Sequence, residues 1–147
     1  MNKYEFQEKV INAQELIQQG LYQEAVGICD GMNLELLDRP RELRMIAKAY
    51  EKCRRYEDAK ALLAQARELA PRSRGILFQL CNTAIKAGDL QSADTYYEDF
   101  CRLAPKDSQR YVLQYRLSSA KQRPDDELID DIAAYFKVSR SELTGKE

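Results

Sequence analysis

Apolar residues recur at helical spacing through residues 43–69, and the pattern changes phase once, at Arg54–Arg55. This spacing predicts two consecutive helices joined by a short turn. Pro71 ends the second helix, because proline has no amide hydrogen and its ring clashes with the preceding turn. Neither helix can bury its apolar face alone, so the stretch predicts a helical hairpin. The two apolar faces consist of Leu43, Ile46, Ala47 and Tyr50, and then of Tyr56, Ala59, Leu62, Leu63, Ala66 and Leu69.

The hairpin pattern repeats with a period of 34 residues. Each turn, in the segments GLYQEA, RRYEDA and GDLQSA, places Tyr or Leu three residues before an alanine. Alanine lacks bulk where two helices approach closely, and Gly20 and Gly88 allow the turn between helices. The positions that keep the interval are Tyr22, Tyr56 and Leu90; Ala25, Ala59 and Ala93; and Pro71 and Pro105.

A repeat of this length and pattern resembles the tetratricopeptide repeat, a helix–turn–helix unit that stacks into a superhelix. The resemblance implies an all-α fold, a right-handed superhelix of antiparallel helical hairpins that forms one domain over residues 1–147. Its units are expected at 6–39, 40–73 and 74–107, with a degenerate unit at 108–141. The opening MNKYEF and the early hairpins are also similar to the N-terminal part of uncharacterised bacterial proteins with these repeats.

The first unit is the least regular. Helices are expected over residues 2–19 and 22–32, and the stretch 31–40 is expected to be a longer loop or a frayed helix end. Pro40 suits the first turn of the next helix, where an amide hydrogen is not needed. The residues expected to face inwards are Phe6, Val10, Ala13, Leu16, Ile17, Ala25, Val26, Ile28 and Cys29.

The third unit is expected over residues 73–104, with its turn at 87–89. Ser73, and after it Asp107 or Ser108, are placed to cap the helices that follow. The residues expected to face inwards are Leu77, Leu80, Cys81, Ala84, Ile85, Ala93, Tyr96, Tyr97, Phe100 and Leu103.

The fourth unit departs from the pattern. Its first helix is expected to use Tyr111, Val112, Tyr115 and Leu117, but Pro124 stands where the earlier units have Tyr or Leu. We expect a return helix over about 125–137, opened by the proline and favoured by its acidic first turn. Residues 139–142 have the form of a capping box, which predicts either a short terminal cap or the N-terminal part of a longer protein. Residues 132–145 are also similar to segments of bacterial helix-turn-helix regulators.

Composition narrows the class of protein. The net charge of −1 creates no field that would attract nucleic acid or an anionic membrane. No apolar run is long enough to span a bilayer and the polar start is not a secretory signal, so we expect a cytoplasmic protein. The cysteines form no CxxC pair, and we expect buried free thiols that pack as small hydrophobic groups. These cysteines are Cys29, Cys53, Cys81 and Cys101.

The sequence offers little chemistry. It contains no histidine, which excludes serine–histidine and cysteine–histidine nucleophiles within this chain. No glycine-rich phosphate-binding motif occurs. The carboxylates within 125–131 lack the spacing of a calcium loop and are interpreted as a solvated helix face. We therefore expect no catalytic residue, no metal and no cofactor.

Binding is the better prediction. If the resemblance holds, the first helix of each hairpin lines the concave side, where family members usually receive peptides. The result would be a locally basic groove suited to acidic or C-terminal peptide carboxylates. The residues predicted for this surface are Gln14, Arg41, Arg44, Lys48, Phe78, Asn82, Lys86 and Arg116, flanked by Val10, Ile17, Gln18, Lys52, Ile85 and Val112.

Several alternatives stay open at this stage. The charged residues of the groove can simply be solvated, since 32% of the chain is charged. The chain can be a regulatory module whose DNA-binding or other effector domain lies beyond Glu147. It can also associate with itself through its last repeat. The clamp by which some family members hold chaperone C-termini is not matched. Lys48 and Gln79 replace two of its asparagines, and Gln109 and Leu113 replace two of its basic residues.

Overall fold

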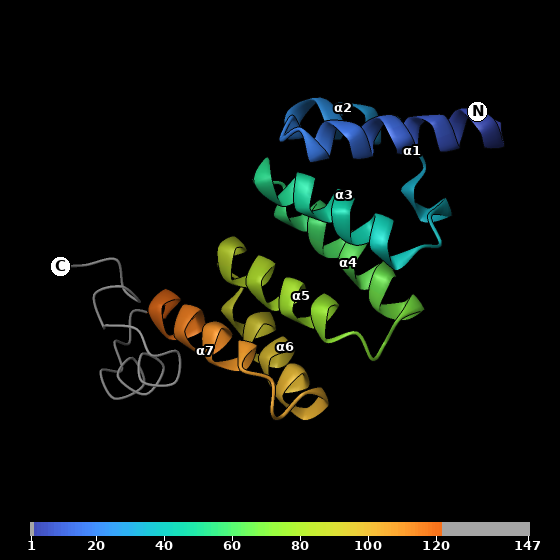
Figure 1. Ribbon diagram of the computed structural model, residues 1–147. Coiled ribbons are helices and arrows are strands. Elements are labelled where there is room, and N and C mark those ends of the chain that lie inside the picture. Colours follow the sequence, from blue (N-terminus) through green and yellow to red (C-terminus); the bar gives the residue numbers. More distant parts are fainter. Residues whose placement is uncertain (1, 122–147) are drawn as a thin grey trace.

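The structure, a computed structural model, describes residues 2–121 and contains no strand in that range. The described residues form three antiparallel helical hairpins and one further helix, which follow one another along the chain (Figure 1). A 3₁₀ turn, η1, lies between the first and second hairpins. The elements are α1 (Lys3–Gln18), α2 (Tyr22–Asp30), η1 (Leu34–Leu36), α3 (Pro40–Lys52), α4 (Tyr56–Leu69), α5 (Arg74–Ala87), α6 (Leu90–Leu103) and α7 (Gln109–Ala120).

The turns of the three hairpins share one backbone feature. Gly20 and Gly88 have φ angles of 77° and 78°, in the left-handed region that glycine adopts without steric cost. Arg54 occupies the corresponding position of the second hairpin, also with a positive φ, of 61°. The phase of the repeat therefore fixes the turn geometry even where the residue is not glycine.

The repeated alanines are fully buried. Ala25, Ala59 and Ala93 are each 0% exposed. Half-buried residues, Tyr22 and Leu90, pack beside the core at the start of their helices. Their burial is consistent with the small residue predicted at this position.

The apolar interior is shared between hairpins. One core cluster joins the first two hairpins and includes Ile76 and Leu80 of α5, and a second cluster includes Leu77 and Cys81 of the same helix. Tyr96 of α6 packs against both clusters. Because α5 contributes to both clusters, no hairpin buries its apolar surface by itself, as the repeat pattern predicts.

Helix ends follow the predicted chemistry. Pro40 is at the first turn of α3, and the Ser73 hydroxyl accepts a hydrogen bond of 3.3 Å from the amide of Ile76. Of the two candidates before α7, it is Asp107 that accepts an amide hydrogen bond, from Gln109 at 2.9 Å. Residues 31–39 form a loop around η1, so the expectation of a longer loop is confirmed and that of a frayed helix end is not.

Some burial predictions were wrong. Leu69 and Leu103 are 47% and 38% exposed, because they are the last residues of α4 and α6, where the helices end. Only two of the four free thiols, Cys29 and Cys81, are buried, and the other two are half-buried. In α7 the buried residues are Leu113 and Leu117, of which Leu113 was not predicted for the core.

Several predictions fall outside the described residues. They are the return helix of the fourth unit at about 125–137, the capping box at 139–142 and the segment 132–145 that is similar to helix-turn-helix regulators. Within residues 2–121, no helix has both the length and the apolar character needed to cross a membrane.

Candidate functional site

The first helices of the units form a continuous series. α1 contacts α3 and α5 contacts α7, and side chains connect α3 to α5. Figure 1 shows α1, α3, α5 and α7 following one another along the molecule, and α1, α3 and α5 are each paired with the second helix of their own hairpin. We call the surface predicted on these helices the inner face. It comprises Gln14, Arg41, Arg44, Lys48, Phe78, Asn82, Lys86 and Arg116.

Three of these residues are in contact at the seam between α5 and α7. Arg116 Nη1 donates a hydrogen bond of 2.9 Å to Asn82 Oδ1, and its Cζ lies 5.8 Å from the centroid of the Phe78 ring. Phe78 also packs edge-to-face on Phe100, with centroids 6.4 Å apart. The core thus supports the Phe78 ring, which in turn supports the Arg116 guanidinium.

Arg44 connects α3 to α5. Its Nε donates to Gln79 Oε1 at 3.0 Å, and Gln79 Nε2 donates to the Arg44 carbonyl oxygen at 2.9 Å. The sequence comparison treated Gln79 only as a replacement for asparagine. Its role as a partner of Arg44 was missed. The available signal was the separation of 35 residues, one more than the repeat period, which places the two residues at adjacent positions of successive first helices.

Lys86 is not a free cation. Its Nζ lies 2.5 Å from Glu51 Oε1, and the Glu51 side chain is only 8% exposed. A buried carboxylate is costly unless a cation neutralises it, so Lys86 has a structural task in addition to any role at the surface.

The remaining residues predicted for this surface differ in how exposed their side chains are. Arg41 and Lys48 are exposed, and Gln14 is half-buried. Val10 and Ile17, predicted to flank the groove, are 1% and 8% exposed, because the packing of α1 on α3 covers that side of α1. These two side chains belong to the core and offer no surface for a ligand.

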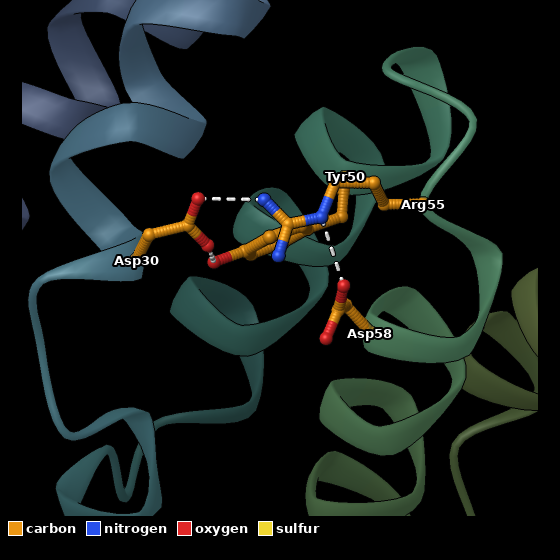
Figure 2. Close-up of polar contacts among 4 residues, drawn as sticks. All are labelled: Asp30, Tyr50, Arg55 and Asp58. Carbon is orange, nitrogen blue, oxygen red and sulfur yellow. Dashed lines mark hydrogen bonds and ion pairs between the residues drawn. The ribbon is translucent and has the colours of Figure 1, made fainter.

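A second polar cluster lies between the first two hairpins (Figure 2). Asp30 accepts hydrogen bonds from Tyr50 Oη at 2.9 Å and from Arg55 Nη1 at 2.6 Å, and Asp58 accepts one from Arg55 Nε at 2.9 Å. The Arg55 guanidinium lies over the Tyr50 ring, with Cζ 4.8 Å from its centroid.

These contacts shift the titration of the cluster. The hydrogen bond from Arg55 holds the pKa of Asp30 below its usual value. Burial, and then the hydrogen bond to Asp30, raises the pKa of Tyr50 well above 10. Asp30 therefore stays ionised and Tyr50 stays protonated, as the hydrogen bond between them requires.

The cluster borders a recess of about 410 Å³ between α2, η1 and α4. Its wall is fixed by Gln65, whose Nε2 donates to the carbonyl oxygens of Leu34 and Leu37 at 3.0 and 2.9 Å. The carboxylates of Asp30 and Asp58 are both paired with Arg55. Because Asp30 belongs to the first hairpin and Arg55 to the second, these contacts join the two units. Over residues 2–121, no group of three or more Cys, Asp or Glu side chains is arranged to hold a metal ion.

Comparison with known families finds a match for part of the chain. Residues 40–83 match the family model of the tetratricopeptide repeat. The match supports the assignment of this part of the chain to the tetratricopeptide repeat family. The matched range covers α3, α4 and most of α5, which includes the seam between Arg44 and Gln79. Tetratricopeptide repeats generally mediate protein–protein interaction and are typically not enzymes. No curated protein matches the chain significantly.

Proposed function

We propose that this tetratricopeptide repeat protein is a non-enzymatic scaffold that binds an extended acidic segment of a partner protein across its inner face. The observation that carries the proposal is the charge of that face. Five of its eight residues are Lys or Arg, and none is acidic, in a chain whose net charge is −1. The residues proposed for this face therefore carry positive charge without a compensating acid among them.

Two of these cations have no polar partner among the described residues. Arg41 and Lys48 are exposed, and neither makes a hydrogen bond or an ion pair with any residue in the described range 2–121. They lie two turns apart on α3, with Arg44 between them. A peptide carboxylate that approaches this helix gains attraction without first displacing an internal acidic partner.

The length of the surface suits a short peptide. Gln14, Lys48, Asn82 and Arg116 recur at intervals of 34 residues, one on each first helix. Packed helices lie about 8–10 Å apart, so this series spans roughly 24–30 Å. An extended peptide rises about 3.3 Å per residue and would cover that distance with about eight residues.

The setting proposed for this interaction is the cytoplasm, where the free thiols of all four cysteines would stay reduced. The domain proposed is the whole chain, with units at 6–39, 40–73, 74–107 and 108–141. An effector domain beyond Glu147 and self-association remain predictions from the sequence.

A peptide array tests the proposal. Wild-type protein is expected to retain peptides rich in Asp and Glu and to ignore the same peptides with Asn and Gln. Arg41→Glu/Lys48→Glu should lose that selection, because it reverses two exposed charges of the inner face. Arg72→Glu/Lys106→Glu is the matched control, with the same change of net charge in exposed loops between units. Equal binding by both variants would refute the inner face as the site.

A further inference from the structure

We infer that Arg44 is the anion-binding anchor of the inner face, and that Gln79 and Gly75 are positioning residues that fix its guanidinium before a ligand arrives. The inference rests on the proposed function and deepens it, since it assigns the carboxylate contact to one side chain. Three features of the seam between α3 and α5 carry it.

The first feature is the double hydrogen bond with Gln79. The amide oxygen of Gln79 accepts from Arg44 Nε at 3.0 Å, and its nitrogen donates to the Arg44 carbonyl oxygen at 2.9 Å. Reversing the amide would set donor against donor and acceptor against acceptor. Both the orientation of Gln79 and the direction of the Arg44 side chain are therefore determined.

The second feature is the absence of a side chain at Gly75, one turn before Gln79 on α5. A Cβ atom at Gly75 would lie 2.8 Å from Arg44 Nη2, 3.0 Å from Nη1 and 3.1 Å from Cζ. The guanidinium thus lies directly on the backbone of α5. Because the crowded atoms are the end of a long side chain, an alanine would move the guanidinium and leave the helices in place.

The third feature is what the guanidinium still offers. Nε is used by Gln79, whereas Nη1 and Nη2 make no hydrogen bond or ion pair to the residues that the structure describes. These two nitrogens form an edge that matches the two oxygens of a carboxylate. A side chain held in advance loses less conformational freedom when the ligand binds, which favours affinity.

The surroundings select the class of ligand. Arg41 and Lys48 lie one turn on either side of Arg44 on the same helix and are exposed. Glu51, two turns after Arg44 along α3, is paired with Lys86. A Glu or Asp side chain of an extended peptide would meet Arg44 directly and find a second cation within one turn.

The Gly75→Ala variant tests the inference. Alanine favours a helix more than glycine does, so the thermal midpoint should stay the same or rise. Binding of fluorescein-labelled octaglutamate, measured by anisotropy, should nevertheless weaken by about fivefold to tenfold, because the fixed carboxylate contact is lost. Gln79→Leu should weaken binding similarly, and labelled octaglutamine is the neutral control probe.

A double-mutant cycle separates positioning from other effects. In an Arg44→Lys background there is no guanidinium to position, so Gly75→Ala should cause no further loss of affinity. Wild-type affinity in the Gly75→Ala single variant, or the same loss in the Arg44→Lys background, would overturn the positioning role while the proposed function stands. If wild-type protein bound neither octaglutamate nor the acidic peptides of the array, both proposals would be wrong.

Discussion

The hydroxyl of Tyr50 in α3 donates a hydrogen bond of 2.9 Å to Asp30 at the end of α2, and this bond joins the second hairpin to the first (Figure 2). Tyr50 is 2% exposed, whereas the Asp30 side chain is 44% exposed. Water can therefore replace the hydroxyl at Asp30. We expect Tyr50→Phe to lower the free energy of unfolding by about 0.5–1.5 kcal/mol in urea denaturation.

The contribution of Asp30 depends on pH. Because Arg55 lowers the pKa of Asp30 in the folded state from its ordinary 3.8, the ionised form stabilises the fold above that pH. Wild type should exceed Asp30→Asn in stability by less than about 1 kcal/mol near neutral pH, since the pair is largely exposed. The difference should shrink as the pH falls below 3.8. A difference that grew on acidification would contradict the proposed charge state.

The turn of the second hairpin offers a stabilising substitution. Arg54 has a φ of 61°, which costs energy for any residue with a Cβ. We expect Arg54→Gly to raise the free energy of unfolding by about 0.5–1 kcal/mol, despite the greater freedom of glycine in the unfolded chain. Gly88→Ala adds a Cβ atom at the matching turn and should lower the free energy of unfolding by about 1 kcal/mol. Urea denaturation of the two variants compares them directly.

Alkaline pH should destabilise the protein through its buried thiols. Burial raises the pKa of Cys29 to about 11 and that of Cys81 to about 12, from 9.0 in the unfolded chain. Above pH 9.0 the unfolded state loses these protons and the folded state keeps them. The free energy of unfolding should then fall by about 1.4 kcal/mol per thiol for each pH unit.

Alanine at both cysteines removes this effect. The slope of stability against pH between 9 and 10 should be much flatter in Cys29→Ala/Cys81→Ala than in wild type. Val26→Ala, a core truncation without a titrating group, is the control and should keep the wild-type slope. An unchanged slope in the double variant would show that other groups dominate this range.

The alanine at the hairpin contact should not tolerate a larger side chain. Ala59 is 0% exposed in α4, and the added volume of leucine has no room there. We expect Ala59→Leu to lower the free energy of unfolding by about 1–3 kcal/mol. Ala61→Leu, two residues later on the exposed side of α4, is the matched control and should change stability by less than about 0.5 kcal/mol. Thermal or urea denaturation followed by circular dichroism would separate the two.

Much of the fold could be read from the sequence because its determinants are local. Helical spacing of apolar residues, Pro40, and the capping Ser73 each act within one or two turns of chain. The exposed Leu69 marks the limit of such reasoning, since the apolar pattern continues to the last residue of α4, which is not buried. Arg54 marks another limit, because its residue type gives no sign of a left-handed backbone and only the phase of the repeat does.

The candidate site was predicted less completely. Spacing identified Asn82 and Arg116 as neighbours on one face, and they are in contact. It did not identify the engagement of Lys86 with Glu51, or the role of Gln79. Those contacts depend on side-chain conformations and on the offset between adjacent helices, neither of which is encoded in the spacing of a single helix.

By itself the sequence determined the helices and their 34-residue phase, because these follow from residue type and position within a turn, and it predicted a basic face on the first helices. Only the tertiary structure decided how each of those basic side chains is held. Arg44 is held on Gly75 and Gln79, Lys86 is paired with a buried carboxylate, and Arg41 and Lys48 stay exposed. The physical reason is that the partners of Arg44 and Lys86 stand 31–35 residues away and meet them only when the hairpins pack.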